Sequence, residues 1–149
     1  MPDAIPVDVC KAIATSLAGA SFSKTISVDR LYIPAYKAED LQSTIKVAVV
    51  NNGYRRDTPT RSRSLVVSDI QARIFIQTKV DANDVADVDE LVYLVEEIHE
   101  HLEQNTFSGA SYVPESNTLP DVLDIFDPDE LKNKGLFFAQ IDVNLRKAG

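Results

Sequence analysis

The chain has 149 residues, 44% of them hydrophobic, which is enough to fill one core and too much for a disordered protein. Its single cysteine, Cys10, excludes an intrachain disulfide and is expected to pack as a small apolar residue. The sequence shows neither a secretory signal pattern nor an apolar run near the roughly 18 residues of a membrane helix. We therefore expect one domain over residues 1–149, soluble and intracellular when made.

The N-terminal third predicts a helix followed by two strands. Apolar residues at three- and four-residue steps predict a helix over 3–18. Strands are expected at 26–33 and at 44–51, and Pro34 would end the first of them because proline supplies no donor to a strand ladder. A connecting segment would join the two strands.

A turn expected at 51–53 is followed by a polar loop that carries four arginines and is longer than a tight hairpin needs. The stretch 64–80 then alternates between apolar and polar residues from residue 70 on, so it predicts one long half-buried strand. Its polar face carries cations and amides, as a solvated or partner-facing surface would. We interpret the second and third strands as an antiparallel hairpin with an extended tip.

The C-terminal half predicts a second helix and a closing strand. An apolar stripe at helical spacing predicts a helix over 87–103, with Asp87 as its N-cap. Residues 108–127 are expected to form a loop, in which 119–126 lays apolar side chains back on the core. A short capped helical turn and an alternating strand over 137–146 complete the chain.

The order helix, strand, strand, strand, helix, strand predicts an α+β fold. We expect a mainly antiparallel sheet of about four strands, with two main helices packed on one face and a long β-hairpin with an extended loop. The predicted core residues lie on the second helix and on the alternating faces of the long strands: Ile74, Ile76, Leu91, Val95, Ile98, Ile141 and Val143.

The sequence shows no arrangement of residues typical of an active site, so we predict no enzymatic activity and no catalytic, cofactor-binding or metal-ligating residues. The acidic stretch 81–92 resembles a calcium loop. Ala86 and Val92, however, occupy the positions that need Gly and a bidentate Glu, so helix capping is the better interpretation. His99 and His101 would lie about 200° apart on their helix and would not ligate one metal from one face.

Charge is distributed unevenly along the chain, whose net charge is −8. The stretch 81–130 contains 15 acidic residues and no Lys or Arg, whereas 55–79 contains six basic and two acidic residues. Such asymmetry more often serves assembly or steering than catalysis, although a solvated acidic face is the simpler alternative. The interface candidates come from the basic region: Tyr54, Arg55, Arg56, Arg61, Arg63, Arg73 and Lys79.

Two kinds of partner suit the arginine loop, defined here as residues 54–63. Its arginines would contact phosphate while Tyr54 stacks on a base, which would make the chain a small binding domain for an acidic ligand or nucleic acid. The net charge and a sequence pI near 4.7 argue against a dedicated nucleic-acid binder, which is usually basic. Docking on the acidic surface of a neighbouring protein is the favoured interpretation.

Several segments of the chain occur in a characteristic order. An Arg-x-Tyr-x-Pro-x-Tyr segment precedes an Asp-Leu pair and a valine-rich strand: Arg30, Tyr32, Pro34, Tyr36, Asp40 and Leu41. An acidic helix start at 87–91 and a closing Phe-Phe-Ala-Gln-Ile-Asp-Val-Asn-Leu strand follow, while 108–127 has no feature that aligns. In this order the chain resembles the tail terminator (tail completion) proteins of tailed bacteriophages.

The resemblance implies a virion structural protein of the tail or neck, present in the host cytoplasm during assembly. It implies a closed homo-oligomeric ring, commonly a hexamer, that caps the tail tube, stops tube polymerisation and joins the tail to the head. The implied partners are further copies of the chain, the tail tube protein and a head-tail connector or neck protein. No cofactor and no membrane are implied, and DNA would only pass through the ring. In related folds the loop between the second and third strands tends to face the tube, which would suit the arginine loop.

Overall fold

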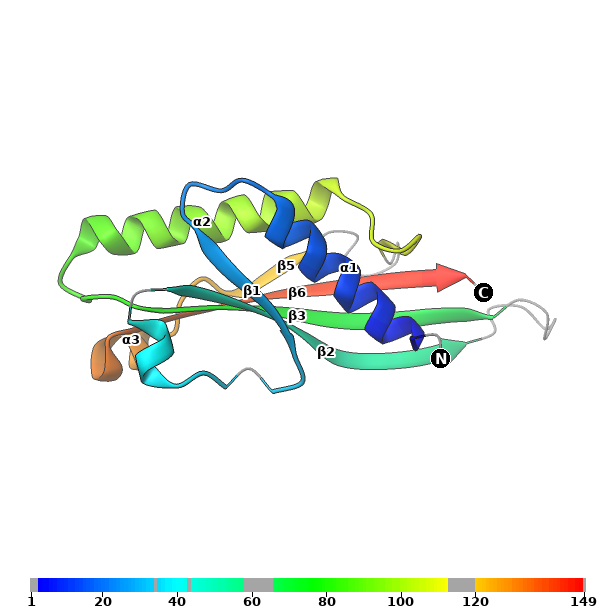
Figure 1. Ribbon diagram of the computed structural model, residues 1–149, viewed down its shortest axis with the longest axis horizontal. Coiled ribbons are helices and arrows are strands. Elements are labelled where there is room, and N and C mark those ends of the chain that lie inside the picture. The colour runs from blue at the N-terminus through cyan, green and yellow to red at the C-terminus, as the bar shows by residue number, and fades with distance from the viewer. Residues whose placement is uncertain (1–2, 34, 43, 58–65, 113–119, 149) are drawn as a thin grey trace.

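The computed structural model describes residues 3–33, 35–42, 44–57, 66–112 and 120–148. One sheet runs through the molecule, with α2 above it, α1 crossing in front of it, and η1 and α3 below it in Figure 1. The elements in chain order are α1 (Ile5–Gly19), β1 (Ile26–Leu31), η1 (Ala38–Leu41), β2 (Ile45–Asp57), β3 (Val67–Lys79), α2 (Val85–Gln104), β4 (Ser111–Tyr112), β5 (Asp121–Asp124), α3 (Pro128–Lys134) and β6 (Leu136–Ala148).

The sheet has the strand order β1-β2-β3-β6-β4, and β5 pairs with β6 beside β4. β1 runs parallel to β2, and every other pair is antiparallel. The antiparallel pairing expected for the second and third strands is confirmed. β3 also pairs with β6 from Val67 opposite Ala148 to Lys79 opposite Leu136, so it is the central strand of the molecule.

The predicted architecture, a mainly antiparallel sheet of about four strands with two main helices, is wrong. The described chain has six strands in a mixed sheet and three α-helices. β4 and β5 lie within 108–127 and are two and four residues long, too short to show a period of two. β1 is parallel to β2 because the connection 32–44 returns the chain to the same end of the sheet, which a tight turn cannot do.

The turn predicted at 51–53 is instead a bulge inside β2. The pairing of β2 with β3 shifts register between Asn51 and Gly53, and the Asn51 side-chain oxygen accepts a hydrogen bond from the Gly53 N–H at 3.2 Å. A Cβ at position 53 would stand 3.1 Å from Oε1 of Gln71, so glycine fits where the two strands approach closely. β2 therefore continues to Asp57, and the first residues of the predicted loop belong to a strand.

α2 begins earlier than its sequence pattern predicts. Its N-cap is Asp84, whose Oδ1 accepts a hydrogen bond from the backbone N–H of Asp87 at 3.2 Å, so the prediction of Asp87 as N-cap is wrong. Asp81 accepts a similar bond from the Asn83 N–H at 3.0 Å. Only Asp84 binds a backbone donor of the first turn of α2, one of the groups that the helix itself leaves unpaired, whereas the Asp81 bond lies in the turn before the helix.

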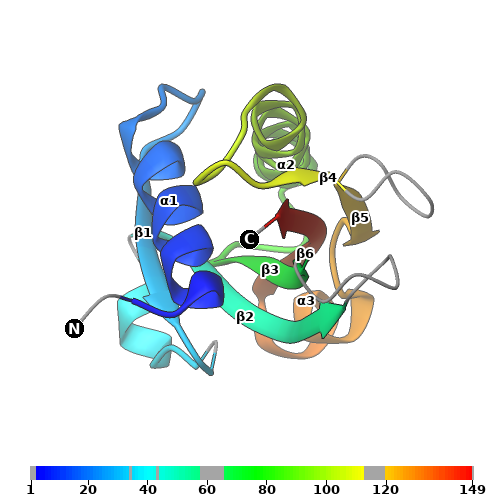
Figure 2. The same ribbon diagram turned by 90° about the vertical axis from the view of Figure 1, so that its right-hand side faces the viewer.

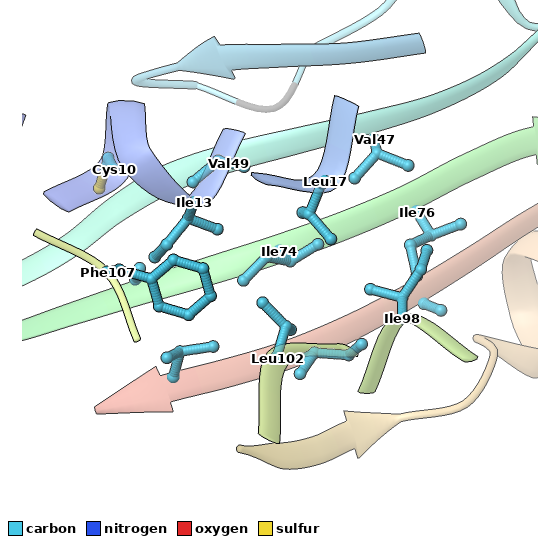
Figure 3. Packing of buried hydrophobic residues seen from close by; sticks show 14 of the residues in the cluster. Cys10, Ile13, Leu17, Val47, Val49, Ile74, Ile76, Ile98, Leu102 and Phe107 are labelled. Atoms are coloured by element: carbon cyan, nitrogen blue, oxygen red, sulfur yellow. The ribbon is translucent and has the colours of Figure 1, made fainter. Parts of the chain in front are cut away.

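The core lies between α1, α2 and the sheet (Figure 3). The four-residue spacing of Val9, Ile13 and Leu17 puts all three on the face of α1 that meets the sheet. Cys10 is buried beside them, as predicted, and burial raises the pKa of its thiol. The seven core predictions are confirmed because each residue is at most 4% exposed: Ile74, Ile76, Leu91, Val95, Ile98, Ile141 and Val143.

His101 links α2 to α1. Its Nε2 lies 2.8 Å from Oγ of Ser16, and its ring meets Phe22 edge-on with the ring centres 5.6 Å apart. Burial lowers the pKa of His101 below its usual 6.5, although a hydrogen bond with the backbone of Ser16 acts in the opposite direction. The neutral imidazole is therefore the form that the fold favours.

Acidification should weaken the contribution of His101 to stability. A base whose pKa is lower in the folded than in the unfolded chain contributes fully above its unfolded pKa and loses that contribution as the pH falls below it. The difference in melting temperature between the wild type and His101→Gln should therefore shrink between about pH 8 and about pH 5.5. A difference that stays constant over this range would contradict the prediction.

Candidate interaction surfaces

The arginine loop is only partly described. Tyr54, Arg55 and Arg56 lie at the end of β2, and all three side chains are exposed. β2 and β3 run together beyond α1 and α2 toward this end, near the C-terminus (Figure 1). Arg61 and Arg63 lie outside the described residues. The structure therefore brings three of the seven predicted interface residues to one end of the sheet.

Arg73 and the acids around it form a ladder of charges on the face of the sheet away from α1 and α2. The register sets Arg73 opposite Asp142 and Asp69 opposite Arg146. Nε of Arg73 lies 3.8 Å from Oδ1 of Asp142, and Nε of Arg146 donates to Oδ1 of Asp69 at 2.8 Å. Arg73 thus forms an ion pair within its own chain. This pairing gives no support to its prediction as an interface residue. Lys79 is exposed and lies about 20 Å farther along β3.

The sequence pattern of β3 by itself does not predict this ladder. The polar residues of 137–146 alternate with core residues, so Asp142 and Arg146 had to share one face of the closing strand. An antiparallel register between that strand and β3 would have placed them opposite Arg73 and Asp69. The alternation of polar residues is visible in the sequence, but the charge pairs follow from it only when the order of the strands in the sheet is known.

One edge of the sheet ends in an exposed apolar bend. β1 is the edge strand (Figure 2), and the two residues after it, Tyr32 and Ile33, are 67% and 74% exposed. We call these two residues the edge bend. The guanidinium of Arg30 lies 5.5 Å from the centre of the Tyr32 ring, so a cation stands beside the bend. These residues belong to the Arg-x-Tyr-x-Pro-x-Tyr segment, whose Pro34 lies outside the described residues.

Tyr36, the last residue of that segment, has a structural role. Its hydroxyl donates to Oδ2 of Asp29 at 3.3 Å, and the ammonium of Lys46 lies 5.9 Å from the centre of its ring. Burial, together with the charge and hydrogen bond of Asp29, raises the pKa of Tyr36 far above its usual value. The tyrosine therefore stays neutral and fastens the connection 35–42 to β1 and β2.

The other edge carries an apolar groove between α2 and β5. The cavity has a volume of about 210 Å³, and we call it the edge groove; its lining residues are Val92, Val95, Glu96, His99, Val122 and Ile125. His99 closes one side, because its Nε2 lies 2.6 Å from the carbonyl oxygen of Pro120. Its Nδ1 lies 3.3 Å from a carboxylate oxygen of Glu103.

The exposed residues after this groove contradict a second prediction. The sequence predicts that 119–126 lays its apolar side chains on the core; Leu119 lies outside the described residues. Val122 does pack against the core cluster, but Leu123, Ile125 and Phe126 are 41%, 48% and 38% exposed. β5 pairs only with β6 at this edge, so the described chain leaves these three side chains partly exposed. Exposed apolar residues close together in this way are typical of binding surfaces.

The histidines point to different parts of the molecule, as their spacing predicts. His99 faces the segment before β5, and His101 faces α1. Over the ranges that the structure describes, no group of three or more His, Cys, Asp or Glu side chains is placed to hold a metal ion. None of the helices in those ranges is long and apolar enough to cross a membrane.

Comparison with known proteins gives no assignment. No model of a known protein family matches the chain, and no characterised protein is significantly similar to it. A function must therefore be argued from the surfaces themselves and from the sequence pattern.

Proposed function

We propose that this chain is a virion structural protein that closes into a ring on the end of a phage tail tube. The ring would stop tube polymerisation and join the tail to the head or neck. The proposal is supported by the order of sequence segments that resembles tail terminator proteins and by the exposed surfaces of the fold. Ring formation and end-capping need complementary surfaces and no catalytic group.

The observation that carries the proposal is the difference between the two edges of the sheet. One edge ends in the exposed edge bend, and the other carries the edge groove and the exposed residues after it. Two unlike surfaces on opposite sides of one subunit favour head-to-tail contacts. Such contacts close into a ring when the rotation between neighbours allows it.

The end of the β2–β3 hairpin supplies a third surface, with Tyr54, Arg55 and Arg56 exposed. Arginine forms bidentate contacts with carboxylates, and tyrosine adds apolar area with a polar tip, so both are common where proteins bind each other. If the edges of the sheet join subunits to one another, this end remains available to the tube or neck.

The test is the mass of the native particle and its effect on tube growth. The purified chain should give one discrete multiple of 16.5 kDa, alone or on adding the tail tube protein from the same genome. Added during tube polymerisation, it should shorten the tubes and be found at their ends. A chain that stays monomeric under both conditions and leaves tube length unchanged would overturn the proposal.

The second candidate is a small domain that binds an acidic ligand or nucleic acid through the arginine loop. The exposure of Arg55 and Arg56 is the observation in its favour. A monomeric chain that retards DNA at physiological salt would favour this function over the ring.

A further inference from the structure

We propose that the edge bend of one copy docks into the edge groove of a second copy, with Ile33 as the main anchor and Tyr32 beside it. The inference rests on the proposed ring but names the two surfaces that would build it. Each subunit would then give its bend to one neighbour and receive a bend from the other.

The edge bend and the edge groove of one chain lie too far apart to contact each other. The bend follows β1, and the groove lies beside β5, with β2, β3 and β6 between them. At about 4.8 Å between neighbouring strands, the two edges are about 19 Å apart. Figure 2 shows β1 and β5 on opposite sides of the molecule. The occupant of the groove must therefore come from another molecule.

The groove and the bend are both largely apolar. The groove of about 210 Å³ is lined mainly by aliphatic side chains, among them Val92, Val95 and Val122. Water in such a site finds few polar partners, so an apolar group that displaces it gains affinity. Ile33 is 74% exposed and can lose that surface only to a partner.

The charges around the two surfaces are opposite. Arg30 stands beside the bend, in contact with the Tyr32 ring. Glu96 lines the groove, Glu100 is exposed one turn farther along α2, and residues 81–130 contain no Lys or Arg. A second copy approaching with its bend toward the groove would bring Arg30 close to these acids. The opposite pairing, groove against groove, would set acids against acids, which disfavours a two-fold dimer through this surface.

Single substitutions on either surface should break the contact. We expect Ile33→Asp and Ile125→Asp each to raise the dissociation constant between subunits by at least about thirtyfold, as for an interface hot spot. Both side chains are exposed, so each variant should keep the wild-type melting temperature when both proteins are monomeric. Val85→Asp is the matched control, because Val85 is 67% exposed but lies outside the groove at the start of α2.

A mixture of the two variants separates this inference from other contacts. Ile33→Asp retains an intact groove, and Ile125→Asp retains an intact bend. An equimolar mixture should therefore form a heterodimer joined through one wild-type contact, whereas each variant alone stays monomeric in sedimentation velocity runs. A two-fold contact would not give this result, because both partners would then carry a damaged surface.

The outcomes distinguish the inference from the ring itself. Monomeric variants, a heterodimer on mixing and a normal ring from Val85→Asp would support the inference. Rings that persist in both variants, or variants that stay monomeric when mixed, would overturn it and leave the proposed ring intact. A wild type that is monomeric alone and with tube protein would overturn both.

Discussion

Replacing Ile98 with alanine should lower the free energy of unfolding by about 2–5 kcal/mol. Ile98 lies in the middle of α2 and is fully buried in the same cluster as Ile74 and Ile76 (Figure 3). The substitution removes apolar contacts and leaves a cavity that the neighbouring strands, held by their ladder hydrogen bonds, cannot fill by collapsing. Denaturant titration at a fixed protein concentration measures the loss, because oligomerisation would add to apparent stability.

Glu100→Ala is the control for this experiment. It shortens an exposed side chain on the same helix, two residues away, and should change the free energy of unfolding by no more than about 0.5 kcal/mol. Equal, small effects from both substitutions would mean that α2 does not pack on the sheet through this face.

The long, strongly periodic elements were predictable from the sequence. Each of α2, β3 and β6 buries one face. Its apolar residues therefore recur at helical spacing in α2 and at every second position in β3 and β6, and these periods can be recognised in the sequence. For the same reason the predicted core residues of these elements, such as Ile74, Val95 and Ile141, are all buried.

The sheet order was not predictable, because it depends on contacts between distant segments. β1 and β2 are neighbours in sequence, and only the path of 32–44 decides that they run parallel. β4 and β5 are short additions to β6 and carry no periodic signal. At the start of α2, several aspartates compete as caps, and Asp84 is the N-cap because it accepts from the Asp87 N–H.

The candidate surfaces were predictable only in part. The arginine loop is visible as a charge pattern, and the exposure of Arg55 and Arg56 agrees with it. The ion pair between Arg73 and Asp142 and the exposure of Ile125 depend on the sheet order. From the sequence alone, an apolar residue such as Ile125 is predicted to lie in the core. Whether its side chain is buried depends on the residues next to it in the folded chain.

Replacing all four arginines of the loop with serine should leave the melting temperature nearly unchanged and prevent ring formation or binding to tube ends. The four substitutions are Arg55→Ser, Arg56→Ser, Arg61→Ser and Arg63→Ser. Exposed charges contribute little to folding, typically less than about 1 kcal/mol each. At an interface, the same side chains meet carboxylates in bidentate geometry and set the register and the association rate.

A matched variant controls for net charge. It replaces four cations outside the loop with serine: Lys11, Lys24, Lys132 and Lys134. Both variants become more negative by the same amount, so a general increase in repulsion between subunits would affect them equally. We expect the lysine variant to assemble and cap tubes normally, and wild-type association to weaken as salt rises, because salt screens the contacts of the arginines.

Three measurements on the arginine variant therefore decide what the loop does: its melting temperature, its native mass and its capture of tube ends. Normal mass and normal capping would mean that the loop is only a solvated segment, despite its four cations. A large fall in melting temperature would mean that the arginines stabilise the fold through contacts such as those near Asp69, opposite Arg55 in the register. If the wild type retards DNA at physiological salt and the arginine variant does not, the loop binds nucleic acid, because loss of phosphate contacts weakens binding regardless of sequence.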